Sequence, residues 1–218
     1  MTTVTARRRR RIPVGVVLAG GASRRMGQDK ALLRPGGGPA LLERAVAALG
    51  EAGLEEIAVV VSTPGRARSL QEALAGLRAA PFLADEAPGL GPLGGLHAAL
   101  RAYPGRAVLL VACDMPRLDA RALRLFTEPD DADVVVPRVA GRDQPLHARY
   151  GPACLPVVAR LLQEGRLAMR DLLTAPTLRI RALDAATLSR RGVPLDAFAN
   201  VNTPADLADL AALGDADG

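Results

Sequence analysis

Residues 14–30 read VGVVLAGGASRRMGQDK, a short apolar run that changes abruptly into a glycine-rich, cationic segment. The apolar part, Val14–Ala19, is too short to cross a membrane and has the length of one buried strand. In the second part, glycines let the backbone approach a ligand where a Cβ would clash, and Arg24, Arg25 and Lys30 supply hydrogen-bond donors. This combination predicts a strand that leads into a phosphate-binding loop.

Lys30 is the only lysine of the chain, since every other basic side chain is arginine. A compact ammonium on a flexible stem suits a polyphosphate, and an ordinary surface lysine is the alternative. The position of Lys30 at the end of the glycine-rich segment favours phosphate binding.

The segment fits neither the Rossmann G-x-G-x-x-G turn nor the P-loop, because five residues separate Gly21 from Gly27 and Gln28 comes next. It resembles L-A-G-G-x-S-x-R-M-G-x-D-K, the signature of the molybdenum cofactor guanylyltransferases, which are nucleotidyltransferases built on a Rossmann-like sheet. The matching positions are Leu18-Ala19-Gly20-Gly21, Ser23, Arg25-Met26-Gly27 and Asp29-Lys30. With three further motifs in the family's order, the resemblance extends from Val14 to about Leu210.

Length and charge favour one α/β domain that buries roughly 70% of the surface its unfolded chain exposes. The net charge of +5 comes from Arg7–Arg11, because removing those five from 28 basic side chains leaves 23 against 23 acidic ones. With one lysine and 2% aromatic residues, the chain is not expected to bind nucleic acid. We interpret residues 1–12 as a disordered basic arm, 13–213 as a single nucleotidyltransferase domain and 214–218 as a tail.

The N-terminus imitates a signal peptide, but its apolar part is interrupted by Pro13 and Gly15, so we interpret it as a strand. No run of about twenty apolar residues predicts a membrane span. Cys113 and Cys154 lack the paired spacing of a metal site, and a chain of this size needs no disulfide. We therefore expect a cytoplasmic protein with no membrane partner.

Strands and helices alternate along the chain, which predicts a mainly parallel sheet wrapped by helices, a Rossmann-like three-layer sandwich. We expect strands at 14–19, 57–61, 81–84, 107–112 and 178–182, helices at about 39–52, 67–77, 93–103 and 154–163, and a turn at 62–65. Residues 134–150 are expected to form an inserted hairpin or an antiparallel edge.

A second glycine-rich loop spans residues 85–95 and leads into the helix expected to begin at Leu93. A helix N-terminus presents free N–H groups and a positive dipole end to an anionic or polar ligand, and a purely structural turn is the alternative. In the family that this chain resembles, a G-P-L-x-G segment lies at the guanine end of the nucleotide. The resemblance therefore assigns Asp85, Gly91, Pro92 and Leu93 to nucleotide binding.

The apolar run 107–112 ends in Cys113-Asp114-Met115-Pro116, which places Asp114 just after it. In a doubly wound sheet, ligands collect beyond the carboxyl ends of the strands, so this carboxylate is expected in the same crevice as the first loop. It suits Mg²⁺ held against phosphate oxygens, with a turn or cap residue as the alternative. Its resemblance to the family's C-D-x-P motif favours a metal ligand, whereas Asp119 is interpreted as a helix N-cap.

The second substrate is assigned by resemblance to four residues. Arg142 and Gln144 lie where the family handles that substrate, and Asn200 and Asn202 match its F-x-N-x-N-T-P element, whose asparagines line the active site. His97 and His147 are interpreted as structural or surface residues, since neither accompanies a recognisable nucleophile.

The resemblance implies transfer of GMP from GTP to the phosphate of molybdopterin or molybdenum-loaded molybdopterin, with release of pyrophosphate. That phosphate is largely ionised near pH 7, so the reaction needs no general base and depends on positioning and charge stabilisation. The implied catalytic residues are Arg25, Lys30 and Asp114, with Mg²⁺ on Asp114. The implied nucleotide contacts are Leu18, Ala19, Gly20, Gly21, Lys30, Ser62, Asp85, Gly91, Pro92, Leu93 and Asp114. Ser62 departs from the asparagine that some members carry there.

Three other functions stay open. A molybdopterin cytidylyltransferase usually has L-A-A-G where this chain has Leu18-Ala19-Gly20-Gly21, and it lacks the G-P-L-x-G loop. A sugar-1-phosphate nucleotidyltransferase is another enzyme of this type, and a nucleotide-binding regulator without turnover is the non-enzymatic alternative. For a guanylyltransferase, the further expected partners are molybdenum-insertion proteins and maturation proteins of apo-molybdoenzymes.

Overall fold

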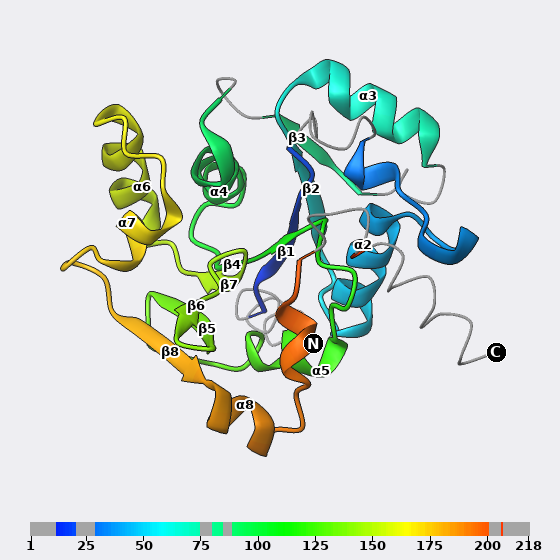
Figure 1. Ribbon diagram of the computed structural model, residues 1–218. Helices are drawn as coiled ribbons and strands as arrows, with labels where there is room; N and C mark the ends of the chain where they lie inside the picture. The colour runs from blue at the N-terminus through cyan, green and yellow to red at the C-terminus, as the bar shows by residue number, and fades with distance from the viewer. Residues whose placement is uncertain (1–11, 21–28, 75–79, 85–88, 201–205, 207–218) are drawn as a thin grey trace, which may run out of the picture.

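Eight strands form one sheet at the centre of the described chain (Figure 1). The computed structural model describes residues 12–20, 29–74, 80–84, 89–200 and 206. The strands are β1 (Val14–Leu18), β2 (Ile57–Val61), β3 (Phe82–Ala84), β4 (Val108–Ala112), β5 (Val134–Val139), β6 (Arg142–Asp143), β7 (His147–Tyr150) and β8 (Ile180–Asp184). Residues 1–11 of the predicted basic arm (1–12) and the tail at 214–218 lie outside the described residues.

The strands β3, β2, β1 and β4 run parallel in that order. Next comes β7, which is antiparallel to both β4 and β5, while β8 pairs parallel with β5. The predicted mainly parallel α/β sheet is therefore confirmed. The expected hairpin exists between β5 and β6, but the prediction of an antiparallel edge is wrong for β7, which lies inside the sheet.

The helices cover both faces of the sheet (Figure 1). They are α2 (Leu41–Glu51), α3 (Pro64–Ala73), α4 (Gly91–Ala102), α5 (Ala120–Leu125), α6 (Cys154–Gln163), α7 (Met169–Leu173) and α8 (Ala185–Arg190). Short 3-10 turns are η1 (Lys30–Leu32), η2 (Pro35–Gly37) and η4 (Leu195–Phe198). No described helix has the length and apolar character needed to span a bilayer.

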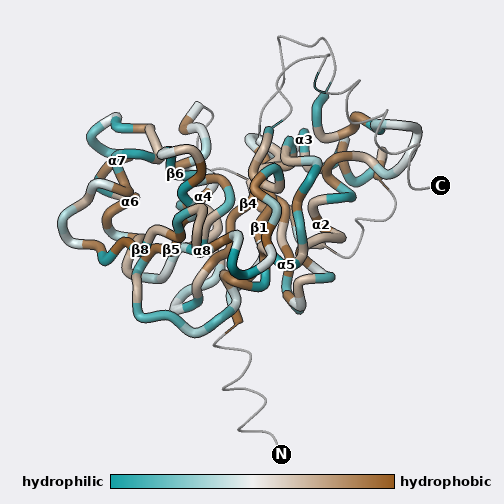
Figure 2. The backbone as a smooth tube through the Cα atoms, turned by 60° about the horizontal axis from the view of Figure 1, so that its bottom comes forward, coloured by the Kyte–Doolittle hydropathy of each residue, from teal (hydrophilic) through white to brown (hydrophobic). Residues whose placement is uncertain are grey.

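Alternating side chains of the central strands feed two separate apolar cores. In β4, Val108 and Leu110 pack with α4, α6 and α7, whereas Leu109 and Val111 pack with residues of α2, α5 and α8. This follows from the two-residue period of a strand that is buried on both faces. Hydrophobic residues accordingly dominate β1 and β4 in Figure 2. The two cores complete the expected three layers.

Several element boundaries differ from those predicted. The turn expected at 62–65 is wrong because Thr63 accepts a hydrogen bond from Arg66 N and starts α3, with Pro64 at its first position. The helix α4 begins two residues earlier than predicted, at Gly91, and β8 begins two residues later, at Ile180. Helix α2 begins at Leu41, where Glu43 accepts a hydrogen bond from Ala40 N.

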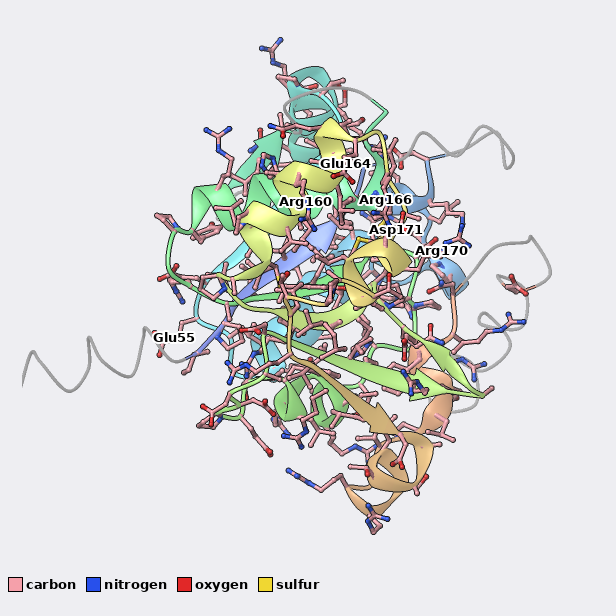
Figure 3. All side chains as sticks on the ribbon, turned by 90° about the vertical axis from the view of Figure 1, so that its left-hand side faces the viewer. Glu55, Arg160, Glu164, Arg166, Arg170 and Asp171 are labelled. Atoms are coloured by element: carbon pink, nitrogen blue, oxygen red, sulfur yellow. The ribbon has the colours of Figure 1, made fainter. Side chains whose placement is uncertain are left out.

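The outer surface of α6 and α7 carries a chain of ion pairs, labelled in Figure 3. Glu164 lies 3.8 Å from Arg160 and 3.6 Å from Arg166, and Arg166 lies 3.4 Å from Asp171. Exposed pairs of this kind contribute little to stability. They form the solvated face of helices whose apolar side packs on the sheet.

His147 is fully buried in the core beneath α5. Its ring lies between Phe126, at a centroid distance of 5.4 Å, and Phe198, at 4.6 Å. Within the described residues, neither ring nitrogen has a hydrogen-bond partner. Burial lowers the pKa of His147 to about 3, and the nearby charge of Asp119 opposes this only in part. The imidazole is therefore neutral at physiological pH and belongs to the apolar core.

The buried imidazole predicts loss of stability in mild acid. The unfolded chain takes up a proton near pH 6.5 and the folded chain only near pH 3, so the stability contributed by His147 is present above pH 6.5 and falls between these values. From pH 6.5 to 4.5 the loss is about 2 kcal/mol. Urea unfolding of the wild type and of His147→Leu checks this, because the variant should lack that part of the slope; parallel pH profiles would contradict it.

Candidate functional site

A pocket of about 400 Å³ opens beyond the carboxyl ends of β1, β2 and β4. Its position fits the rule that ligands of open α/β sheets bind where the parallel strands end. The register explains its floor, because Leu18 of β1 lies opposite Val60 of β2 and opposite Ala112 of β4. The lining residues are Leu18, Gly20, Lys30, Val60, Ser62, Gly89, Gly91, Pro92, Gly95, Ala112, Cys113, Asp114 and Leu146.

Lys30 and Asp114 meet at this pocket from distant parts of the chain. Lys30 Nζ lies 3.1 Å from Asp114 Oδ2 and donates a hydrogen bond to it. The side chains are only 16% and 24% exposed, so the two opposite charges are close in a partly desolvated place. Asp114 follows β4, and Lys30 opens η1, so the sheet and this turn together place both charges on the pocket wall.

Asp29 holds the turn that carries Lys30. Its Oδ1 accepts a hydrogen bond from Ala31 N at 3.0 Å and so caps η1. Its carboxylate also receives two hydrogen bonds from Arg66, at 2.6 and 2.8 Å. Asp29 is therefore engaged by a guanidinium and by the backbone, next in sequence to the ammonium that faces the pocket.

The helix α4 packs unusually close to the strand ends. A Cβ added to Gly95 would lie 2.6 Å from Leu18 Cδ2 and 3.3 Å from Val60 Cγ1, both of which belong to pocket-lining residues. Glycine at position 95 lets the first turns of α4 lie against β1 and β2 without displacing the Leu18 side chain. At the start of the same helix, Gly91 adopts a φ of +62°, which favours glycine.

Cys113 is buried beside the two charged pairs. Burial, helped by the neighbouring Asp114 carboxylate, raises the pKa of its thiol to about 12, while Arg66 and Lys30 oppose the shift. The thiol therefore stays protonated at neutral pH. A nucleophilic role would need the thiolate, so Cys113 belongs to the wall of the pocket.

The described side chains fit a metal ion that is shared with a substrate. Within the described ranges, no group of three or more His, Cys, Asp and Glu residues could hold a metal. Among the described residues that line the pocket, Asp114 alone carries a carboxylate. Mg²⁺ is usually bound by one or two carboxylates together with substrate phosphates and water, so this donor set suits Mg²⁺ that arrives with a polyphosphate.

The structure places many of the predicted nucleotide contacts on the pocket wall. Those that line it are Leu18, Gly20, Lys30, Ser62, Gly91, Pro92 and Asp114. The side chain of Leu93 packs in the core, and the backbone oxygen of Ala19 accepts a hydrogen bond from Arg66. Gly21, Arg25, Asp85 and Asn202 lie outside the described residues.

The described residues that were predicted to bind the second substrate do not line this pocket. Arg142 is exposed on β6, and Gln144 follows it, donating a weak hydrogen bond from its side chain to Arg142 O at 3.4 Å. Asn200 is exposed after η4. The described pocket wall includes none of these three, although Leu146 joins it two residues after Gln144.

Residues 15–181 match the model of the MobA-like NTP transferase domain. The chain belongs to this family. A probable molybdenum cofactor guanylyltransferase of Pelotomaculum thermopropionicum is 38% identical over 194 residues, which cover 88% of this chain and 89% of that relative. A relative with the same description in Bacillus subtilis is 37% identical over 164 residues, or 73% of this chain and 77% of the relative.

Solved structures agree with the MobA-like fold. Molybdopterin-guanine dinucleotide biosynthesis protein A from Archaeoglobus fulgidus superimposes with a TM-score of 0.78 at 24% identity, covering 93% of this chain and 98% of that one. 2-C-methyl-D-erythritol 4-phosphate cytidylyltransferase from Thermus thermophilus gives a TM-score of 0.64 at 20% identity, covering 94% and 100%. At these identities the two structures support the nucleotidyltransferase fold alone.

Gly95→Ala should disturb the pocket more than the fold of this MobA-like chain. The new methyl overlaps the side chain of Leu18, which lines the pocket and must shift. Overpacking costs about 1–3 kcal/mol, partly offset by about 0.5–1 kcal/mol from replacing a helical glycine. We expect GTP affinity to fall about tenfold with a smaller fall in thermal stability.

Gly50→Ala is the matched control for this substitution. Gly50 lies exposed in α2, and an added Cβ would meet Ile57 Cδ1 at an ordinary 4.0 Å. It should raise the free energy of unfolding by about 0.5–1 kcal/mol and leave GTP binding unchanged. Unaltered GTP binding by Gly95→Ala, measured calorimetrically, would contradict the role of this close packing.

Proposed function

We propose that this chain is a molybdenum cofactor guanylyltransferase, which transfers GMP from GTP to the terminal phosphate of molybdopterin or molybdenum-loaded molybdopterin. The observation that carries the proposal is the pairing of Lys30 and Asp114 at the pocket beyond the strand ends, in a chain 38% identical to a relative described by that activity. A cytoplasmic location and contacts with molybdenum-insertion or molybdoenzyme maturation proteins are parts of the same proposal.

The reaction joins a phosphate oxygen of the pterin to the α-phosphorus of GTP. The bond from that phosphorus to the bridging oxygen breaks, and pyrophosphate leaves with the electron pair. Because the attacking phosphate is already ionised near neutral pH, the chain need not remove a proton from it. Catalysis then depends on holding the two phosphates in line and on stabilising charge as it grows on the leaving group.

Lys30 and Asp114 have different roles in this stabilisation. The Lys30 ammonium can exchange its contact with Asp114 for phosphate oxygens, because lysine is a flexible point charge with three donors. Asp114 would hold Mg²⁺, which when bound supplies positive charge to the phosphate oxygens. The strand-end backbone at Gly20 and the start of α4 at Gly91 form the neighbouring walls of the pocket.

The direct test is pyrophosphate release with each nucleoside triphosphate, with and without molybdopterin. We expect release that requires both GTP and the pterin. Turnover of CTP in place of GTP would indicate the cytidylyl reaction, and turnover with mannose- or glucose-1-phosphate would indicate a sugar nucleotidyltransferase. Binding of GTP without any release in the presence of the pterin would favour a regulator.

Asp114→Ala should abolish turnover and leave the fold intact, because the pocket loses its magnesium ligand. The assay is pyrophosphate release at saturating Mg²⁺, together with circular dichroism. Asp171→Ala is the matched control, since the Asp171 side chain is 25% exposed against 24% for Asp114 and it lies in the surface ion pairs of α7. If the Asp114 variant kept most of its activity with Mg²⁺, its assigned role would be rejected.

Lys30→Ala should lower the rate by roughly two to three orders of magnitude, the scale observed when one charge-stabilising donor is lost. As a control, Arg160→Ala also removes one positive charge, from the exposed outer face of α6, and should leave the rate unchanged. Steady-state kinetics with GTP and molybdopterin measure both. A rate equal to that of the wild type would show that the Lys30 ammonium does not contact the reacting phosphates.

A further inference from the structure

Arg66 makes three hydrogen bonds that join separate parts of the site. Its Nε donates to Ala19 O at 2.6 Å, and its two terminal nitrogens donate to the two carboxylate oxygens of Asp29 at 2.6 and 2.8 Å. The Arg66 side chain is only 14% exposed and the Asp29 side chain 24%. A two-pronged arginine–carboxylate contact of this kind is both stronger and more directional than a surface ion pair.

The contact partners of Arg66 flank the glycine-rich segment in sequence. Ala19 follows β1, and its N–H donates to Val60 O at 2.8 Å, which ties it to β2. Asp29 precedes Lys30 directly and caps the turn that begins with it. One guanidinium therefore fixes the last residue before Gly20 and the residue that orients Lys30.

The start of α3 gives Arg66 this reach. Thr63 caps the helix by accepting a hydrogen bond from Arg66 N at 3.2 Å, so the backbone of Arg66 is held at the helix N-terminus. Ser62, on the pocket wall, immediately precedes that cap. Because α3 starts directly after β2, the position of β2 fixes that of Arg66, which in turn holds Asp29.

Charge balance gives a second reason for the contact. An unpaired Asp29 carboxylate beside Lys30 would repel an anionic ligand and compete for the ammonium. With Arg66 on Asp29, its negative charge is neutralised within a bidentate pair. The ammonium of Lys30 is then oriented toward Asp114 and the pocket.

We propose that Arg66 is a positioning residue, which holds Asp29 and Ala19 so that the Lys30 ammonium faces the triphosphate of the bound nucleotide. The proposal rests on the proposed function, since it assigns the pocket to a nucleoside triphosphate. Arg66 acts through Lys30 and is not assigned a contact with substrate. The alternative is that Arg66 only stabilises the fold.

The test is a double-mutant cycle between Arg66 and Lys30. Arg66→Lys keeps the charge but loses the two-pronged geometry, so kcat/KM for GTP should fall about tenfold with KM for the pterin unchanged. In a Lys30→Ala background, the same substitution should change kcat/KM by less than twofold, because there is no ammonium left to position. Arg68→Lys, on the exposed face of α3, is the matched control and should change neither.

A second variant guards against a folding defect in Arg66→Lys. Asp29→Glu keeps the carboxylate and moves it by one methylene, so it should lower kcat/KM in the wild-type background and again have no effect in the Lys30→Ala background. Thermal unfolding is recorded for every variant. If kcat/KM fell by the same factor in both backgrounds, or did not fall in the wild-type background, the positioning role would be overturned.

Equilibrium binding of GTP separates this proposal from the reaction. Suppose that the wild type binds GTP, and that the Arg66 substitution weakens GTP binding only when Lys30 is present, but that no pyrophosphate appears with any acceptor. The positioning role then stands and the guanylyl transfer fails. If pyrophosphate is released and the cycle is additive, the reaction stands and the positioning role fails. A wild-type chain that binds no nucleoside triphosphate would overturn both.

Discussion

The parallel register of β1 between β2 and β4 is the constraint on which the rest of the structure depends. It places Leu18 opposite both Val60 and Ala112, so three strand ends share one edge of the sheet. The chain segments that follow these strands then meet at one pocket. Gly20, Ser62 and Asp114 line the same pocket because their strands end together, and not through any nearness in sequence.

Two ion pairs organise the charges at that edge. Lys30 with Asp114 and Arg66 with Asp29 combine two positive and two negative groups within a partly buried region. Each pair has a different geometry, since one is a single contact of a flexible ammonium and the other is a bidentate arginine contact. The rigid pair supports the turn, and the flexible pair can be exchanged for ligand contacts.

The fold class could be predicted because local patterns were enough for it. Apolar runs of strand length, separated by helical segments, indicated the parallel sheet, and the position of Asp114 after β4 indicated the pocket. The place of β7 could not be predicted, because the sequence of a four-residue strand does not indicate whether it lies at the edge of a sheet or between two other strands. The start of α3 was missed because Pro64 suits both a turn and the first position of a helix.

The contacts of Arg66 could not be predicted either. Its partners lie 37 and 47 residues away in sequence, and no periodicity connects an arginine in a helix with a carboxylate before a distant turn. The one available signal was Asp29 itself, an acid next to a lysine in a cationic segment, which required a partner. Similarly, Leu146 joined the pocket only through the insertion of β7 beside β4.

The order of strands also determines when this pocket can assemble. Val14 of β1 pairs with Val108 of β4, so the central pairing joins residues far apart in the chain and pays a large loop-closure entropy. During synthesis on a ribosome, β1 and β2 emerge before β4, the strand that pairs with the other side of β1. The pocket therefore cannot form until β4 and Asp114 have been synthesised, and until then the apolar strands β1 and β2 lack a neighbour that would protect them from aggregation.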